Sequence, residues 1–137
     1  SWSKDTKSAA RMINARADTV AVKPAFRAAF RSRRCLITAD GFYEWKSVAG
    51  RKQPYHIHLA SRRLFAFAGL WERWRPPAGG DPIESCTIIT TEAIPALQAL
   101  HDRMPVILPE DACGVWLDGN VDPEALSPLL RPFDAEP

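Results

Sequence analysis

Short runs of apolar, β-branched and aromatic residues dominate the middle of the chain, and they predict strands more often than helices. Strands are expected at residues 35–37, 41–45, 55–59, 64–71, 86–91 and 106–108. Apolar residues at helical spacing, or a proline followed by acidic residues, predict short helices at 23–33, 92–100, 109–117 and 122–130. Loops rich in polar residues, proline or glycine are expected at 47–53 and 75–82. The pattern favours an α+β fold with a curved, barrel-like, mainly antiparallel sheet and a few short helices.

Length and composition fit an ordinary globular domain. The 137 residues predict a single domain over 1–137, with a frayed tail at 131–137. No apolar run is long enough to span a membrane, and the first residues do not have the pattern of a signal peptide. The three cysteines, Cys35, Cys86 and Cys113, are odd in number and widely spaced. We therefore expect no disulfide framework and a cytoplasmic location.

Charge is distributed unevenly along the chain. Residues 1–63 contain 14 Lys and Arg and 4 Asp and Glu, a net of +10, whereas residues 64–137 contain 4 and 12, a net of −8. A basic segment of this size favours an anionic partner such as the phosphates of a nucleic acid. The alternative is that the two halves face each other and neutralise in the fold.

A first candidate site lies at Asn14 and Arg16, which follow an apolar pair. In an extended segment, residues two apart point to the same face, away from Ala15. Asn14 and Arg16 are therefore candidates for binding. The alternative interpretation is a turn asparagine and a solvated arginine.

A second candidate is Glu44, within a strand-like aromatic run. By alternation it shares a face with Phe42, and a carboxylate on an aromatic face is costly to bury unless it is paired. Glu44 is therefore a candidate general acid or base. Pairing with a nearby arginine on an edge strand is the alternative.

The third candidate is the string His101-Asp102-Arg103, which follows a predicted helix. Histidine is the natural proton shuttle near neutral pH, and the planar fork of an arginine suits a phosphate. A histidine at a helix end, without further function, is the alternative. His56 and His58 alternate on a strand but lack a third ligand nearby, so neither a metal site nor a cofactor is expected.

Cysteines and tryptophans complete the candidate chemistry. Each cysteine is expected to be a small core residue rather than a nucleophile. Tryptophans at 2, 45, 71 and 74 accompany the basic half and are possible stacking platforms for unpaired bases, although most are expected in the core.

Seven strings occur along the chain, in the order I-N-A-R-A-D-T, K-P-A-F-R, R-R-C-L-I-T-A-D-G-F-Y-E-W-K, K-Q-P-Y, F-A-F-A-G-L-W-E, I-I-T-T-E-A and H-D-R-M-P-V-I-L. Together they resemble the SOS response-associated peptidase (SRAP) family from Trp2 to about Leu117. Members of this family bond covalently to abasic sites in single-stranded DNA. A cysteine at the mature N-terminus closes a thiazolidine ring on the sugar aldehyde, and the same cysteine is linked to autoproteolytic removal of the initiator methionine.

The resemblance implies a role for each candidate. Asn14 would orient the N-terminal residue and the sugar, Glu44 would act as acid and base, and His101 would shuttle the proton that opens the sugar ring. Arg16 and Arg103 would hold phosphates beside the lesion. A further residue, Trp2, would lie against the DNA. The expected partner is single-stranded DNA with an abasic site, bound by a monomer without a cofactor.

The chain departs from the family pattern at its start. Family members begin with Met-Cys-Gly-Arg and continue through a long segment before a W-x-K-D motif. This chain opens at Ser1 within that motif and does not contain the nucleophilic cysteine, so we expect either a fragment of a longer protein or a truncated paralogue. Asp18 stands where members often have Glu, and Thr38 where many have Pro.

Two other functions remain open from the residues alone. One is hydrolysis of peptide bonds in other proteins, with His101 as base and Glu44 as the group that orients it. The other is a non-catalytic module in which the basic half binds single-stranded nucleic acid.

Overall fold

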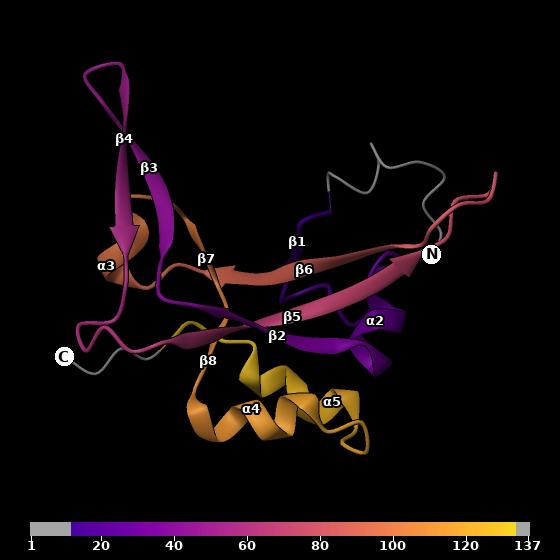
Figure 1. The fold of residues 1–137 in the computed structure, drawn as a ribbon. Helices are drawn as coiled ribbons and strands as arrows, with labels where there is room; N and C mark the ends of the chain where they lie inside the picture. The colour runs from indigo at the N-terminus through magenta and orange to yellow at the C-terminus, as the bar shows by residue number, and fades with distance from the viewer. Residues whose placement is uncertain (1–11, 134–137) are drawn as a thin grey trace.

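The protein is seen in a computed structural model that describes residues 12–133 (Figure 1). Six strands form one sheet that curls into a half-barrel: β1 (Asn14–Arg16), β2 (Arg34–Ala39), β5 (Phe65–Trp74), β6 (Ile83–Glu92), β7 (Arg103–Pro105) and β8 (Ile107–Leu108). A separate two-stranded hairpin contains β3 (Phe42–Val48) and β4 (Arg51–Ile57). The helices are α2 (Arg27–Ser32), α3 (Pro95–Gln98), α4 (Glu110–Leu117) and α5 (Pro123–Leu126), and α5 runs into the 3-10 turn η1 (Ser127–Leu129). The predicted α+β class with a curved, mainly antiparallel sheet is confirmed.

Strands β5 and β6 form the centre of the sheet, in the order β1-β6-β5-β2. Their antiparallel pairing runs from Trp74 opposite Ile83 to Gly69 opposite Ile88. Beyond that point the two strands separate, and the segment of β7 and β8 enters between them. Val106 bridges the gap, because its N–H donates to the carbonyl of Ile89 at 2.8 Å and its carbonyl accepts from Ala68 at 2.9 Å. This separation gives the sheet its curl.

Helices α2, α4 and α5 cover one face of the half-barrel and bury the larger hydrophobic cluster against it (Figure 1). Trp116 of α4 is fully buried, packs on Phe30 of α2 with ring centroids 6.0 Å apart, and donates its indole N–H to the carbonyl of Cys35 at 2.9 Å. Removing an aromatic side chain from such a core typically costs about 3–5 kcal/mol. Trp116 therefore ties α4 to both β2 and α2.

Arg34 closes the same region from the polar side. Its guanidinium donates to the carbonyls of Trp116, Asp118, Phe30 and Arg31 at 2.7–2.8 Å, which are the free acceptors at the ends of α2 and α4. Burial lowers the pKa of Arg34 below its ordinary value, since desolvation disfavours the charged form. One arginine of the basic half is thus used to hold two helix ends rather than to form surface.

The β3–β4 hairpin stands away from the sheet as an arm (Figure 1). Phe42 at its base packs edge-on against Phe67 of β5, with centroids 5.9 Å apart, within a second hydrophobic cluster. The predicted loop over 47–53 is wrong, because the strands continue to Val48 and resume at Arg51. Ala49 and Gly50 alone form the turn, both with positive φ (49° and 77°), the geometry of a tight hairpin turn.

Other predicted elements are confirmed in place but differ in length. The helix expected at 23–33 is reduced to α2, preceded by turns, and that expected at 92–100 is reduced to α3. The helix expected at 122–130 divides into α5 and η1, whereas α4 agrees with its prediction to within one residue. At the chain end, Phe133 packs against the second cluster. Within the described residues, no helix is long and apolar enough to cross a membrane.

Candidate nucleic-acid interface

Strand β1 places Asn14 and Arg16 on one exposed face, as their spacing predicts. Ala15 between them is 2% exposed and points into the core. The strand is held by parallel pairing to β6, in which Asn14 lies opposite Ile88 and Arg16 opposite Thr90. A three-residue strand thus presents two polar side chains at the edge of the sheet, beside β6.

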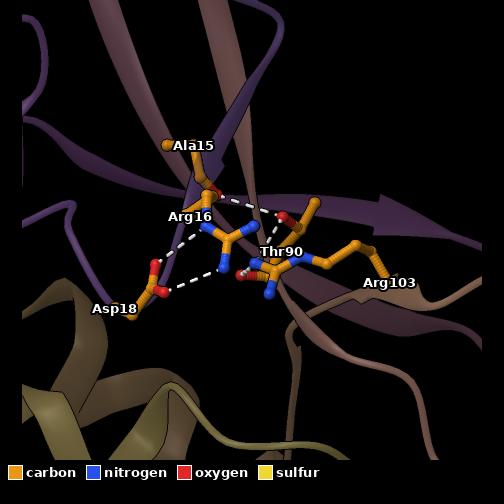
Figure 2. A network of polar contacts seen from close by, with 5 residues as sticks. All are labelled: Ala15, Arg16, Asp18, Thr90 and Arg103. Atoms are coloured by element: carbon orange, nitrogen blue, oxygen red, sulfur yellow. Dashed lines mark hydrogen bonds and ion pairs between the residues drawn. The ribbon is translucent and has the colours of Figure 1, made fainter.

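Arg103 reaches the same position from the other side of β6. Its guanidinium donates to the carbonyl of Thr90 at 2.8 Å and to the Thr90 hydroxyl at 3.1 Å. Thr90 pairs with Arg16 on one side and with Pro105 of β7 on the other. Arg103 itself lies opposite Glu92, and its long side chain reaches back along β6 to Thr90. Figure 2 shows their guanidinium groups side by side at Thr90. We call this surface, formed by Arg16, Thr90 and Arg103, the arginine face.

Asp18 supplies a negative charge to this face. Its two carboxylate oxygens accept from Nε and Nη2 of Arg16 at 3.1 and 2.9 Å, a two-pronged ion pair (Figure 2). The hydrogen bonds from Arg16, with the nearby charge of Arg103 as a smaller cause, hold the pKa of Asp18 below its ordinary value. The pKa of Arg16 is raised by Asp18 and, more weakly, by Asp102 and Glu92. Both side chains of the pair are more than half exposed, so solvent screens it.

A small cavity of about 220 Å³ lies beside the arginine face. The residues that line it include Asp18, Arg103, and Thr91 and Glu92 of β6. Its lining therefore combines a guanidinium with carboxylates. Such a mixed lining suits a ligand with both an anionic group and hydroxyl or ring donors.

His101 lies beside Arg103, after the end of α3. Its Nδ1 lies 3.0 Å from the backbone nitrogen of Arg103, 3.2 Å from the carbonyl oxygen of the same residue and 3.2 Å from a carboxylate oxygen of Asp102. About half of the His101 side chain is exposed. A histidine so placed can exchange protons with a bound ligand.

Glu44 lies on the hairpin rather than on the sheet. It is half-buried, on the face of β3 that it shares with Phe42, as the alternation predicts. Phe42 belongs to the same cluster as Ile88 and Met104, which neighbour Asn14 and Arg103 respectively. Among residues 12–133, no hydrogen bond or ion pair joins Glu44 to Asn14 or His101. Phe42, two residues from Glu44, thus connects the base of the hairpin to the strands that carry Asn14 and Arg103.

The opposite face of the hairpin carries a row of rings that we call the aromatic stripe: Trp45, Tyr43, His56 and His58. Successive ring centroids lie 6.3, 4.9 and 5.4 Å apart. Three basic residues, Lys46, Arg51 and Lys52, accompany a single acid, Glu44, in the two strands. By alternation Lys52 shares the face of the aromatic stripe, whereas Lys46 and Arg51 share the opposite face with Glu44. Exposed aromatic rings with a basic residue on the same face are a combination that binds unpaired bases.

Several expectations about single residues need correction. Trp45 and Trp71 are exposed (53% and 41%), so the expectation that most tryptophans are buried is wrong for these two. Trp2 lies outside the described residues. Burial raises the pKa of the Cys35 and Cys113 thiols, which disfavours the reactive thiolate and agrees with a packing role. Cys86 is exposed, so the expectation that each cysteine is a core residue is wrong there. Among residues 12–133, no three metal-binding side chains cluster closely enough to hold an ion.

Thr90 and Asp18 were not among the sequence candidates. Thr90 occurs in a β-branched run that predicts a strand, and its contact with Arg103 depends on pairing between distant segments. Asp18 offered a weak signal, because a carboxylate two residues after an arginine can fold back on it when a turn follows. The two charge halves also neutralise in part, since Arg33 pairs with Glu72 at 3.0 Å and Arg63 with Glu110 at 3.3 Å.

The model of the SOS response associated peptidase (SRAP) family matches residues 1–137. The chain belongs to the SRAP family. Among curated relatives, abasic site processing protein YoqW of Bacillus subtilis is 50% identical, over 98% of this chain and 61% of its own length. Abasic site processing protein HMCES of Gallus gallus is 35% identical, over 98% of this chain and 47% of its own length. This SRAP chain thus spans about half to three-fifths of those relatives.

Solved structures agree with the family fold. A protein from Bacteroides thetaiotaomicron superposes with a TM-score of 0.88 and 31% identity, over 97% of this SRAP chain and 60% of that protein. A phage-related protein from Bordetella bronchiseptica gives a TM-score of 0.68 and 34% identity, over 87% and 57%. The curled sheet described above is therefore the SRAP fold over the region that the chains share.

Proposed function

We propose that this SRAP chain contributes the DNA-binding and acid–base parts of a protein that processes abasic sites in single-stranded DNA. The observation that carries the proposal is the convergence of Arg16 and Arg103 on Thr90, with His101 next to Arg103. Paired guanidinium groups bind phosphates with defined geometry, and a histidine beside them moves protons near neutral pH. The names of the relatives, abasic site processing proteins, support the same substrate.

In this proposal the arginine face binds the phosphates that flank the lesion. Phosphate contacts fix the position of a strand without reading its sequence, which is what a lesion in any sequence context requires. Asn14, two residues from Arg16 on the same face, would then lie near the sugar that lacks a base. Trp2 is proposed to lie against the DNA.

The chemical step is covalent capture by a cysteine at the N-terminus of the whole protein. Opening of the sugar ring exposes an aldehyde. The amine condenses with its carbon and water leaves, after which the thiol adds to that carbon and closes a thiazolidine. His101 shuttles the proton that opens the ring, and Glu44 acts as acid and base toward the amine or the ring oxygen. The associated autopeptidase activity and a role in the SOS response belong to the same proposal.

The test is a denaturing gel of labelled single-stranded DNA that contains one abasic site. The DNA is mixed with this chain, and separately with the chain preceded by a family-like segment that begins Met-Cys-Gly-Arg. The expected result is a shifted, heat-stable band with the extended protein alone. A band with both proteins would mean that another residue, such as an internal lysine or cysteine, is the nucleophile. No band with either would contradict the covalent step.

A second candidate function is binding of single-stranded nucleic acid without catalysis. The exposed aromatic stripe, with Lys52 on the same face of the hairpin, favours it. Its expected property is salt-dependent binding with equal affinity for intact and abasic strands. A clear preference for the abasic strand would exclude this candidate.

A further inference from the structure

Asp18 occupies the part of Arg16 that a phosphate would use. The carboxylate accepts from both Nε and Nη2, the two-donor edge of the guanidinium that also matches two phosphate oxygens. A carboxylate and a phosphate on this edge exclude each other. The arginine proposed to bind DNA is therefore already paired within the protein (Figure 2).

Backbone geometry keeps Asp18 within reach of this edge. The N–H of Ala17 donates to the Thr90 carbonyl at 2.8 Å, which holds the chain beside β6 immediately after β1. The N–H groups of Thr19 and Val20 then both donate to the carbonyl of Arg16, at 3.1 and 2.9 Å, and turn the chain back. The ion pair thus follows from the turn rather than from free motion of two surface side chains.

The second arginine of the face is held differently. Arg103 is fixed by the neutral carbonyl and hydroxyl of Thr90, and within residues 12–133 no carboxylate lies at ion-pair distance from it. Its charge therefore remains available to an incoming anion, whereas that of Arg16 is masked. The two arginines therefore differ in how readily each can bind an anion.

We propose that the Asp18 carboxylate competes with a DNA phosphate for the guanidinium of Arg16, so that the arginine face binds a strand in two steps. Arg103 binds a phosphate first, and Arg16 follows when the strand displaces the Asp18 carboxylate. Asp18 thereby lowers the affinity for single strands that meet the face only in passing. This inference rests on the proposed function, because it takes the strand to be the ligand of both arginines.

The size of the effect follows from the exposure of the ion pair. An exposed ion pair is weak, so molecules in which Arg16 is unpaired form a substantial minority of the population. The apparent affinity for DNA is the intrinsic affinity multiplied by this unpaired fraction. Replacing Asp18 by Asn should therefore tighten binding of single-stranded DNA by roughly two- to fivefold.

The experiment measures binding of a labelled single-stranded oligonucleotide by fluorescence anisotropy at several salt concentrations. The variants are Asp18→Asn, Arg16→Gln and their double mutant, with Asp81→Asn as a control that removes an equal charge from an exposed loop. We expect Asp18→Asn to bind more tightly than the parent and than Asp81→Asn. The gain should disappear in the Arg16→Gln background. Thermal unfolding of each variant confirms that the fold is retained.

Three results would overturn the inference while leaving the proposed function intact. These are unchanged or weaker binding by Asp18→Asn, an equal gain in Asp81→Asn, and a gain that persists without Arg16. Weaker binding would mean that Asp18 orients Arg16 instead of competing for it. Absence of DNA binding by the parent and by all variants would overturn both the inference and the proposed function.

Discussion

The arginine face and the β3–β4 hairpin present two surfaces that are built in different ways. On the arginine face each arginine has a partner within the protein, since Thr90 holds Arg103 and Asp18 holds Arg16. On the hairpin, rings such as Tyr43 and Trp45 contact mainly one another and remain exposed. The side chains of the arginine face are held by protein partners before a ligand arrives, whereas those of the hairpin are supported by its own two strands. Fixed phosphate contacts beside an adaptable stacking surface suit a strand that contains one abnormal nucleotide.

The largest expected effect concerns chemistry, because the proposed acid–base residues lie one on each region. In a protein that carries the N-terminal cysteine, His101→Ala on the sheet side and Glu44→Gln on the hairpin should each slow crosslinking by about 100-fold or more. Binding of the uncrosslinked strand should persist. The measurement is the initial rate of band formation on a denaturing gel. Unchanged rates in both variants would refute the roles assigned to them.

A smaller effect is expected for the aromatic stripe. Trp45→Ala should weaken binding of single-stranded DNA, since base stacking on an aromatic side chain is worth about 1–3 kcal/mol. The salt dependence should stay the same, because no charge is removed. Anisotropy at two salt concentrations measures both quantities, with Val115→Ala on α4 as the exposed apolar control. An equal loss of affinity in Val115→Ala would show that the stripe is not part of the DNA interface.

The centre of the sheet and the hairpin should also differ in how much stability each loses when a glycine gains a methyl group. In Gly69→Ala the new carbon would lie 2.8 Å from Cδ1 of Ile37 and 3.0 Å from Sγ of Cys35, a crowding in the sheet centre that costs about 1–3 kcal/mol. In Gly50→Ala no atom lies nearby, and the positive φ of the turn costs about 1 kcal/mol. Urea unfolding measures both. A larger loss in Gly50→Ala would contradict the view of the hairpin as an independent arm.

The smallest effect is a pH dependence from Asp18. Arg16 lowers the pKa of this carboxylate in the folded state, so the ion pair adds stability above the pKa of the unfolded chain. That contribution is lost as pH falls through the folded-state pKa. The parent should therefore be slightly more stable than Asp18→Asn at neutral pH, and the difference should vanish in strong acid. Urea midpoints at about pH 6 and pH 2 test the sign.

Local pattern predicted strands at β2 to β6 and β8, the α+β class and the shared face of Asn14 and Arg16, because alternation and β-branched runs act over a few residues. It did not predict the three-residue strands β1 and β7. It could not predict the contact of Arg103 with Thr90, which depends on the register between β6 and β7. It also failed at the hairpin, where the residues on either side of the Ala49–Gly50 turn form strand rather than loop. Pairing across the arm satisfies their backbone, and solvent accepts their side chains.

The central claim is that Arg16 and Arg103 bind phosphates of single-stranded DNA. The most direct measurement is the salt dependence of binding for the parent, Arg16→Gln, Arg103→Gln and the double mutant, with Arg75→Gln in an exposed loop as control. The slope of log affinity against log salt should fall by about 0.7 for each arginine that contacts a phosphate. Arg75→Gln should leave the slope unchanged. A double mutant with the slope and affinity of the parent would contradict the account.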